Sequence, residues 1–370
     1  MTKEELINEL LHNPLSFSRN MMDDLIREKL DFKDIRECIR RIYDLSESQL
    51  EETSNANEGT MGKLNRRSTA KRIKSFNKKI KKLKQDDSYK IIYAEGDSWF
   101  QFPVFIKDII DWLNDNEKYI VYSDAYGGDW ITNIIYESQY VSALSVLRPG
   151  YFLISGGGND MVGNNRLAIM VQKNYLNPKY TNIAQITDPV LSEKQKRMIM
   201  DAQPHITKEF YAFLLTIKAQ YILLFNSIYH PDSPHKDLIS ITQGYDYAIP
   251  SYKKSFSFRY PLKFLVNSIL DTGCWLIRPL KIKGIHEDSL QKALVFTFIY
   301  EFNQIFIELA TSYGFDNVYH VDCRGLARGP EDWYDELHYR NHKYKVVAGA
   351  YSHIIENHGT CPKVIRAAGI

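Results

Sequence analysis

The sequence lacks several features that would place it in a specialised class. Its four cysteines lie far apart and include no CxxC pair, so we expect reduced thiols and no zinc module. No run of eighteen apolar residues occurs, and the closest stretch, residues 262–280, is interrupted by Lys263, Asp271 and Arg278. The chain also has no internal repeat. An ordinary globular protein is therefore expected.

The N-terminal residues differ from a secretion signal, which would be basic and then apolar. Thr2 and Glu5 instead form the capping-box pattern that begins an amphipathic helix. Residues 1–50 continue with apolar side chains on one helical face: Ile35, Cys38, Ile39 and Ile42. The polar residues 51–59 then indicate a linker. We expect a cytoplasmic protein with a helical N-terminal extension.

Lysine and arginine dominate the next segment. Residues 63–84 contain eleven of them and no acidic residue, although the whole chain has a net charge of only +2. The apolar residues of this segment are Leu64, Ile73, Phe76, Ile80 and Leu83, at helical spacing over its second half. A solvated helix docked through this stripe is the favoured prediction. Binding of nucleic acid or an anionic membrane through 63–84 is the alternative, because a basic face attracts phosphates.

The rest of the chain alternates between apolar, strand-like runs and helical patterns. Strands are predicted at residues 90–94, 119–123, 151–155, 221–226 and 317–321. Such alternation is typical of a parallel sheet covered by helices on both faces, a three-layer α/β/α fold. Ligands of such sheets bind at the carboxyl ends of the strands. Polar residues that follow these strands are therefore the candidates for a site.

Ser98 follows the first predicted strand. It lies in a Gly-Asp-Ser-Trp turn at 96–99, between that strand and a helix predicted over 103–113. A serine at such a turn presents its hydroxyl at the edge of the sheet, close to a helix N-terminus that favours negative charge. Ser98 is therefore a candidate nucleophile for acyl transfer.

Glycine-rich loops follow the second and third strands. Asn159 ends a Gly-Gly-Gly-Asn segment and offers an amide donor to the same edge of the sheet. The lysine of a nucleotide-binding loop is missing from this segment. After the second strand, Gly127 and Gly128 both offer a backbone N–H group. Together with the N–H of Ser98, these donors would stabilise a tetrahedral oxyanion.

Asp335 and His338 lie close enough in sequence for one loop to present both. The carboxylate would fix the imidazole tautomer while the other ring nitrogen faces Ser98. His342 is the rival base. On a helix the two histidines would share a face and could bind a metal, but no HExxH-type glutamate lies between them, so we expect no metal.

In this order, the four segments resemble the blocks of the SGNH (GDSL-type) serine hydrolase family, in particular its soluble bacterial members. The resemblance implies that Ser98 is the nucleophile, His338 its base and Asp335 the partner of the histidine. It implies an oxyanion hole made by the backbone N–H groups of Ser98 and Gly128 and the side chain of Asn159. It also implies a flavodoxin-like sheet and no cofactor.

The family's pattern decides one choice and differs at two positions. Its second block resembles Gly-Asp, which favours Gly128 over Gly127. The family has leucine where Trp99 follows the serine, and many members have proline where Tyr339 follows the histidine. A bulky apolar residue such as Trp99 can still pack beneath the turn.

The helical and strand patterns also suggest a domain division, with a lid-like insertion because the third and fifth predicted strands lie far apart. Residues 1–88 would form the partly basic helical extension, and 89–370 the hydrolase domain with insertions at about 164–215 and 240–290. The second insertion mixes aromatic and basic residues. Its aromatic residues, Tyr245 and Tyr247 among them, either line an acyl or glycan pocket or form the insertion's core.

The predicted function is hydrolysis of an acyl or acetyl ester through an acyl-enzyme. Acetylated glycans, lysophospholipids, short acyl esters and thioesters would all suit this machinery. A catalytically silent binding or regulatory protein that uses its basic helix is the alternative. A phosphate-ester hydrolase is a third possibility, although no cluster of metal-binding carboxylates favours it.

Other polar residues receive no catalytic role. The two histidines of residues 230–235 lie among prolines and indicate a surface loop. His320 and Asp322 are interpreted as structural or pocket-lining. Asp97 and Asp160 are expected to bond their own backbone, as short acidic residues beside turns usually do.

Overall fold

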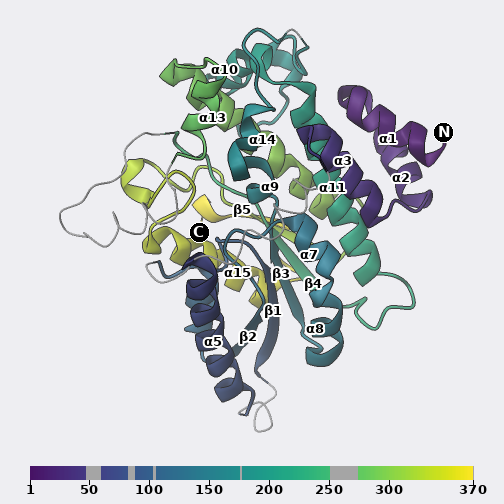
Figure 1. Cartoon of the computed structure of the whole chain (residues 1–370). Helices are drawn as coiled ribbons and strands as arrows, with labels where there is room; N and C mark the ends of the chain where they lie inside the picture. Colours follow the sequence, from purple (N-terminus) through teal and green to yellow (C-terminus); the bar gives the residue numbers. More distant parts are fainter. Residues whose placement is uncertain (47–59, 82–87, 103–105, 176, 251–273, 370) are drawn as a thin grey trace. The chain divides into compact units, whose positions relative to one another are not determined.

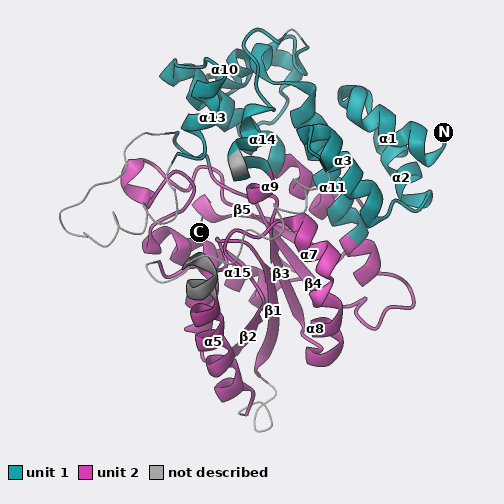
Figure 2. Ribbon diagram, in the orientation of Figure 1, with its two compact units in different colours: residues 1–53, 161–223, 247–302 teal, residues 54–160, 224–246, 303–370 magenta. Residues whose placement is uncertain are grey.

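The computed structural model describes residues 1–46, 60–81, 88–102, 106–175, 177–250 and 274–369 (Figure 1). The chain divides into two compact units, shown in Figure 2. Unit 1 comprises residues 1–53, 161–223 and 247–302, and unit 2 comprises 54–160, 224–246 and 303–370. The first boundary between the units lies after residue 53, whereas the predicted domain boundary lies after residue 88. The basic helix therefore belongs to the unit that contains the sheet.

Unit 2 contains a six-stranded, all-parallel sheet with the order β2-β1-β3-β4-β5-β6. The strands are β1 Lys90–Gly96, β2 Tyr119–Ser123, β3 Tyr151–Ser155, β4 Ile239–Gln243, β5 Val318–Asp322 and β6 Val364–Arg366. The order of the first five strands is the flavodoxin-like one, so the predicted fold class is confirmed. Every residue of β3, β4 and β5 is buried, as expected for a sheet covered on both faces.

Helices cover both faces of this sheet (Figure 1). They are α5 Thr60–Ile80, α6 Ile109–Asn114, α7 Ile131–Glu137, α8 Gln139–Leu147 and α15 Asn341–Asn357. Helices α7 and α8 pack against β1, whereas α6 contacts β2 and α15. The connections β1–α6–β2 and β2–α7–α8–β3 run in opposite directions along the sheet, and right-handed crossovers therefore place their helices on opposite faces.

Two of the predicted elements differ from the structure, and two further strands were not predicted. Residues 221–226, predicted as a strand, belong to the long helix α11 Lys208–Ile228. Two strands were not predicted: β4, which lies in a presumed insertion, and the three-residue β6. The helix predicted over 103–113 begins only at Ile109, after the N-cap Asp108, and residues 103–105 lie outside the described residues.

The basic helix α5 docks on β2 through part of the predicted apolar stripe, in which Ile80 is half-buried. Phe76 is buried, whereas the side chain of Ile73 is 36% exposed. Leu83 and the side chain of Leu64 lie outside the described part of the chain. Two basic residues complete the docking, because Arg72 and Lys79 are themselves buried.

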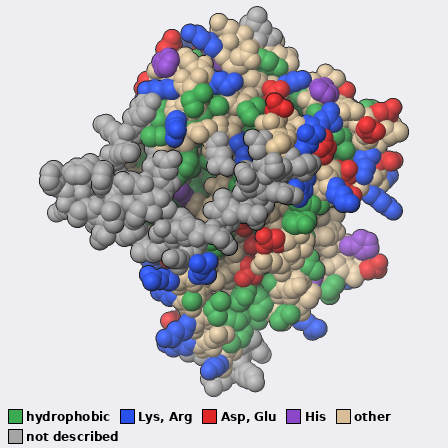
Figure 3. Space-filling model, viewed as in Figure 1, with side chains coloured by type: hydrophobic (Ala, Val, Ile, Leu, Met, Phe, Trp, Pro, Cys, Tyr) green, Lys and Arg blue, Asp and Glu red, His purple; other side chains and the backbone are tan. Residues whose placement is uncertain are grey.

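These two cations have specific partners in unit 2. The Arg72 guanidinium donates to the Asp108 carboxylate at 2.6 and 2.7 Å and to the carbonyl of Phe100 at 2.6 Å. The Lys79 ammonium donates to the carbonyls of Asn114, Asn116 and Tyr119 at 2.6, 2.8 and 3.0 Å. Other lysine and arginine side chains of α5 remain on the surface (Figure 3). Binding of nucleic acid or a membrane by them stays a prediction.

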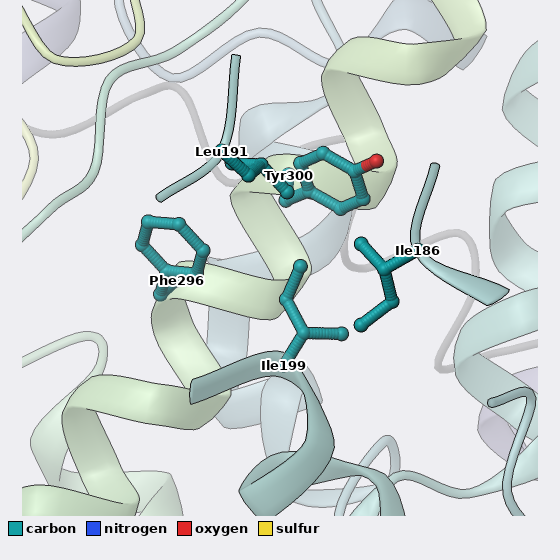
Figure 4. Close-up of a cluster of buried hydrophobic side chains, with 5 residues drawn as sticks. All are labelled: Ile186, Leu191, Ile199, Phe296 and Tyr300. Atoms are coloured by element: carbon teal, nitrogen blue, oxygen red, sulfur yellow. The ribbon is translucent and has the colours of Figure 1, made fainter. Parts of the chain in front are cut away.

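Unit 1 is mostly helical. Its helices include α1 Lys3–His12, α2 Arg19–Arg27, α3 Phe32–Tyr43, α10 Glu193–Ala202 and α13 Ile277–Ile282, with parts of α11 and of α14 Asp288–Thr311. The predicted capping box of Thr2 and Glu5 is confirmed, as is the buried stripe of α3. A hydrophobic cluster joins α10 to α14 (Figure 4); its buried residues are Ile186, Leu191, Ile199, Phe296 and Tyr300.

Helices α11 and α14 are long and apolar enough to span a membrane by composition alone. In their most apolar stretches, however, 72% and 83% of the residues are buried inside the protein. Burial of this extent is typical of core helices, so their apolar character is explained by packing.

Candidate active site

The turn after β1 presents Ser98 at the carboxyl edge of the sheet. The Asp97 carboxylate accepts a hydrogen bond from the N–H of Trp99 at 3.0 Å, and the Asp97 carbonyl accepts from the N–H groups of Phe100 and Gln101. These bonds close a tight turn around Ser98, whose side chain is half-buried. Asp97 thus bonds its own turn, as predicted.

Ser98, His338 and Asp335 form a continuous hydrogen-bonded chain. His338 Nε2 lies 2.7 Å from Ser98 Oγ, and His338 Nδ1 lies 2.9 Å from both carboxylate oxygens of Asp335. His338 is only 5% exposed, and the ring of Phe102 packs edge-on against its imidazole at a centroid distance of 4.6 Å. The arrangement is that of a nucleophile, a base and an orienting carboxylate.

The Asp335 carboxylate is held in its ionised form. Burial by itself would raise its pKa, but the adjacent His338 imidazole and the N–H groups of Leu337 and His338 outweigh this effect. The pKa therefore lies below its ordinary value. Both N–H groups donate to Oδ1 at 2.8 Å. This fixes the carboxylate so that Oδ2 is available only to the imidazole.

His342, the rival base, has another partner. Its Nε2 lies 2.8 Å from Asp332 Oδ1, and its side chain is 59% exposed. Helix α15 begins at Asn341, so His338 lies before the helix and the two histidines share no helical face. Among the described residues, no group of three or more His, Cys, Asp or Glu side chains could hold a metal ion.

The candidate oxyanion donors come from the ends of β1, β2 and β3. Gly128 has φ +95°, a conformation that favours glycine, and a Cβ there would meet open space. Within the described residues, the N–H groups of Ser98 and Gly128 donate to no protein acceptor. The Asn159 amide donates one hydrogen to the Asp129 carbonyl at 2.9 Å, which leaves its second hydrogen free. The choice of Gly128 over Gly127 stays a prediction.

Two aspartates support these loops. Asp160 accepts from the N–H of Ile131 at 3.0 Å and from the hydroxyl of Thr132 at 3.1 Å, so it caps α7 across the loop. Asp129 accepts from the Trp130 N–H and the Asn133 amide, and burial raises its pKa to about 7.

The two departures from the family pattern have structural roles. Trp99 is buried against Tyr245, Tyr339 and Tyr344, as expected for a residue packed beneath the turn. Its indole N–H donates to the carbonyl of Leu337 at 3.2 Å, which ties the serine turn to the loop that carries His338. Tyr339 is fully buried, and its hydroxyl donates to Asp246 at 2.6 Å.

Sequence reasoning named Tyr245 only as an aromatic residue of the second insertion and missed Asp246; both follow β4. The Tyr245 hydroxyl donates to Asp97 at 2.5 Å and accepts from the N–H of Gly158 at 3.1 Å. Asp246 accepts from Tyr339. The signal that would have located both was the alternation of apolar and polar residues in β4, which marks a strand with its end beside the site.

The other polar residues stay outside this constellation. His320 is fully buried, and its Nδ1 lies 2.9 Å from the hydroxyl of Thr242; burial lowers its pKa to about 3. The Asp322 carboxylate pairs with Arg324. The His230 side chain is 64% exposed, in keeping with a surface loop.

Comparisons with known proteins give only remote similarities. No family model and no curated protein matches the chain. A catalytic variant of an acetylxylan esterase from Geobacillus stearothermophilus matches 75% of this chain and 97% of its own, at 11% identity and a TM-score of 0.34. An α/β hydrolase from the metagenome of Lake Arreo matches 71% and 93%, at 11% identity and a TM-score of 0.33.

A third solved structure, described as a GDSL-like lipase from Parabacteroides merdae, matches 58% of this chain and 95% of its own, at 10% identity and a TM-score of 0.22. Esterases of this type are thus among the structural neighbours of the chain. At these TM-scores the likeness carries no argument about activity, so the roles of the residues rest on the geometry of this chain.

Proposed function

We propose that the protein is a serine hydrolase that cleaves an acyl or acetyl ester through an acyl-enzyme. The observation that supports this most directly is the chain of short contacts from Ser98 Oγ through His338 to Asp335. Such a chain activates a hydroxyl whose own pKa is too high for attack at neutral pH.

In the first half of the reaction, Ser98 Oγ attacks the carbonyl carbon while His338 Nε2 accepts the hydroxyl proton. Asp335 stabilises the imidazolium that forms and holds its Nδ1 proton. The tetrahedral intermediate then collapses: the bond to the leaving alkoxide breaks, and Nε2 returns the proton to it as the alcohol departs. In the second half, a water molecule repeats these steps on the acyl-enzyme and releases the acid.

The negative charge of each intermediate would be carried by the carbonyl oxygen. The backbone N–H groups of Ser98 and Gly128 and the Asn159 amide are the proposed donors to it. They follow three neighbouring strands, which supports their convergence on one oxygen atom. Loss of one such donor typically costs about 10² to 10³ in kcat.

The test is reaction with a fluorophosphonate, followed by intact mass and peptide mapping. We expect one adduct per chain on the peptide that contains Ser98, and hydrolysis of at least one p-nitrophenyl ester in a panel of chain lengths. S98A should lose both reactions, whereas S145A, a change of an exposed serine in α8, should keep both. Adduct on another peptide, or undiminished hydrolysis by S98A, would contradict the proposal.

A further inference from the structure

Tyr245 joins two loops that each carry a proposed functional group. Its hydroxyl donates to the carboxylate of Asp97, the residue before Ser98, and accepts from the N–H of Gly158, the residue before Asn159. One oxygen atom therefore contacts both the serine turn after β1 and the glycine loop after β3. Tyr245 itself comes from a third place, the end of β4.

The position of Tyr245 is fixed independently of these two bonds. Its ring is buried and packs edge-on against Trp99 at a centroid distance of 5.2 Å, and its carbonyl accepts from the Asn303 amide at 3.0 Å. The next residue, Asp246, accepts from the N–H groups of Gly325 and Ala327 at 2.5 and 2.7 Å. A hydroxyl held in this way has a fixed position relative to the two loops.

The glycine loop is shaped to receive this tyrosine. A Cβ added at Gly158 would lie 2.7 Å from Cζ and 2.8 Å from the hydroxyl oxygen of Tyr245, closer than real Cβ contacts allow. The backbone of the loop can therefore approach the tyrosine only because residue 158 has no side chain. At their roots the two loops are already paired, since the N–H of Asp97 donates to the Ser155 carbonyl at 3.0 Å. Tyr245 adds a second connection nearer the functional groups.

We infer that Tyr245 is a positioning residue, whose hydroxyl sets the distance between Ser98 and Asn159 and so preorganises the oxyanion hole. The inference rests on the proposed function. Asn159 directly follows Gly158, whose N–H donates to the Tyr245 hydroxyl. Ser98 directly follows Asp97, whose carboxylate accepts from that hydroxyl. Small displacements of catalytic groups are costly, since about 1 Å can reduce a rate 10²-fold.

The experiment is a double-mutant cycle of Y245F with N159A, assayed by p-nitrophenyl acetate hydrolysis. Y245F keeps the packed ring and removes both hydrogen bonds. We expect it to lower kcat about 10-fold with KM nearly unchanged. In the N159A background, Y245F should lower kcat by less than about 2-fold. The Asn159 amide is then absent, so a change in its distance from Ser98 no longer affects the oxyanion.

Y229F is the matched control. Tyr229 is half-buried, and its hydroxyl oxygen lies 2.9 Å from the Leu238 carbonyl and 2.7 Å from Ser240 Oγ, at the opposite end of β4. It should cost similar stability and leave kcat nearly unchanged.

Two outcomes separate failure of the inference from failure of the proposed function. If the wild type hydrolyses the ester and Y245F lowers kcat by the same factor in both backgrounds, or raises KM alone, Tyr245 acts only through general stability and the inference is wrong. If the wild type neither hydrolyses any ester nor reacts with the fluorophosphonate, the proposed function is wrong, and the inference falls with it.

Discussion

The substitution D335N tests the electrostatic design of the site most sharply. The two oxygens of Asp335 are not equivalent: both lie 2.9 Å from the imidazole Nδ1, but only Oδ1 also accepts from the N–H groups of Leu337 and His338, each at 2.8 Å. An asparagine must therefore place its carbonyl oxygen at the first position. Its NH2 group then occupies the second position and faces Nδ1.

This orientation reverses the tautomer of His338. A donor that faces Nδ1 requires that nitrogen to accept, so the ring proton moves to Nε2, where it faces Ser98 Oγ. The imidazole can no longer take the serine proton. From the magnitude typical of such a change, we expect kcat for p-nitrophenyl acetate to fall about 10⁴-fold with the fold intact. Labelling of Ser98 by the fluorophosphonate should slow by a comparable factor.

The control is D332N, because Asp332 contacts His342 Nε2 at 2.8 Å in the same loop, outside the proposed machinery. It should retain most of the activity. A D335N protein with a native circular dichroism spectrum and more than about a tenth of the wild-type kcat would refute the reasoning, since no tautomer argument allows so small a loss.

Three further predictions follow from buried groups. H338A should lower kcat at least about 10⁴-fold while H342A keeps most of the activity, and the reverse result would assign the base to His342. K79M should lower the free energy of unfolding by about 3 kcal/mol, because three carbonyls lose a charged donor, and K78M, at an exposed position, should change it little in urea titrations. Burial raises the pKa of Glu95 to about 8, so the folded state holds a proton that the unfolded chain releases above its usual pKa of 4.5. Stability should therefore fall by roughly 1.4 kcal/mol per pH unit between these values, and a thermal scan of E95Q should lack that loss; equal pH slopes for both proteins would contradict the assignment.

Local pattern was sufficient for the strands that are apolar and bounded by turns. The bounds of β2 and β3 agree with the predicted ones, and β1 and β5 differ only at their ends. The strand predicted at residues 221–226 was wrong, because a short apolar run fits a buried helix as well as a buried strand. Their place within the 21-residue α11 depends on neighbouring turns of the helix, which an apolar window of six residues does not reveal.

The site was predictable only where a residue type carries the chemistry. Ser98 and His338 are 240 positions apart, and the structure places them in contact. Tyr245 and Asp246 form hydrogen bonds with groups of loops that are remote in sequence. No sequence spacing predicts such hydrogen bonds. The docking of α5 was predicted, but two of its contacts were missed for a related reason: Arg72 and Lys79 were counted as solvated charges, whereas partners far along the chain allow them to be buried.

The separation of Ser98 from His338 also has a consequence during synthesis on the ribosome. At translation rates of about 5 to 20 residues per second, 240 residues require roughly 12 to 48 s. Throughout that interval the nascent chain carries a serine without its base, although β4 and Tyr245 are synthesised before His338. The growing polypeptide would therefore acquire the proposed hydrolase activity only when the segment that carries His338 joins the sheet, so a translation product that ends before this segment would be inactive.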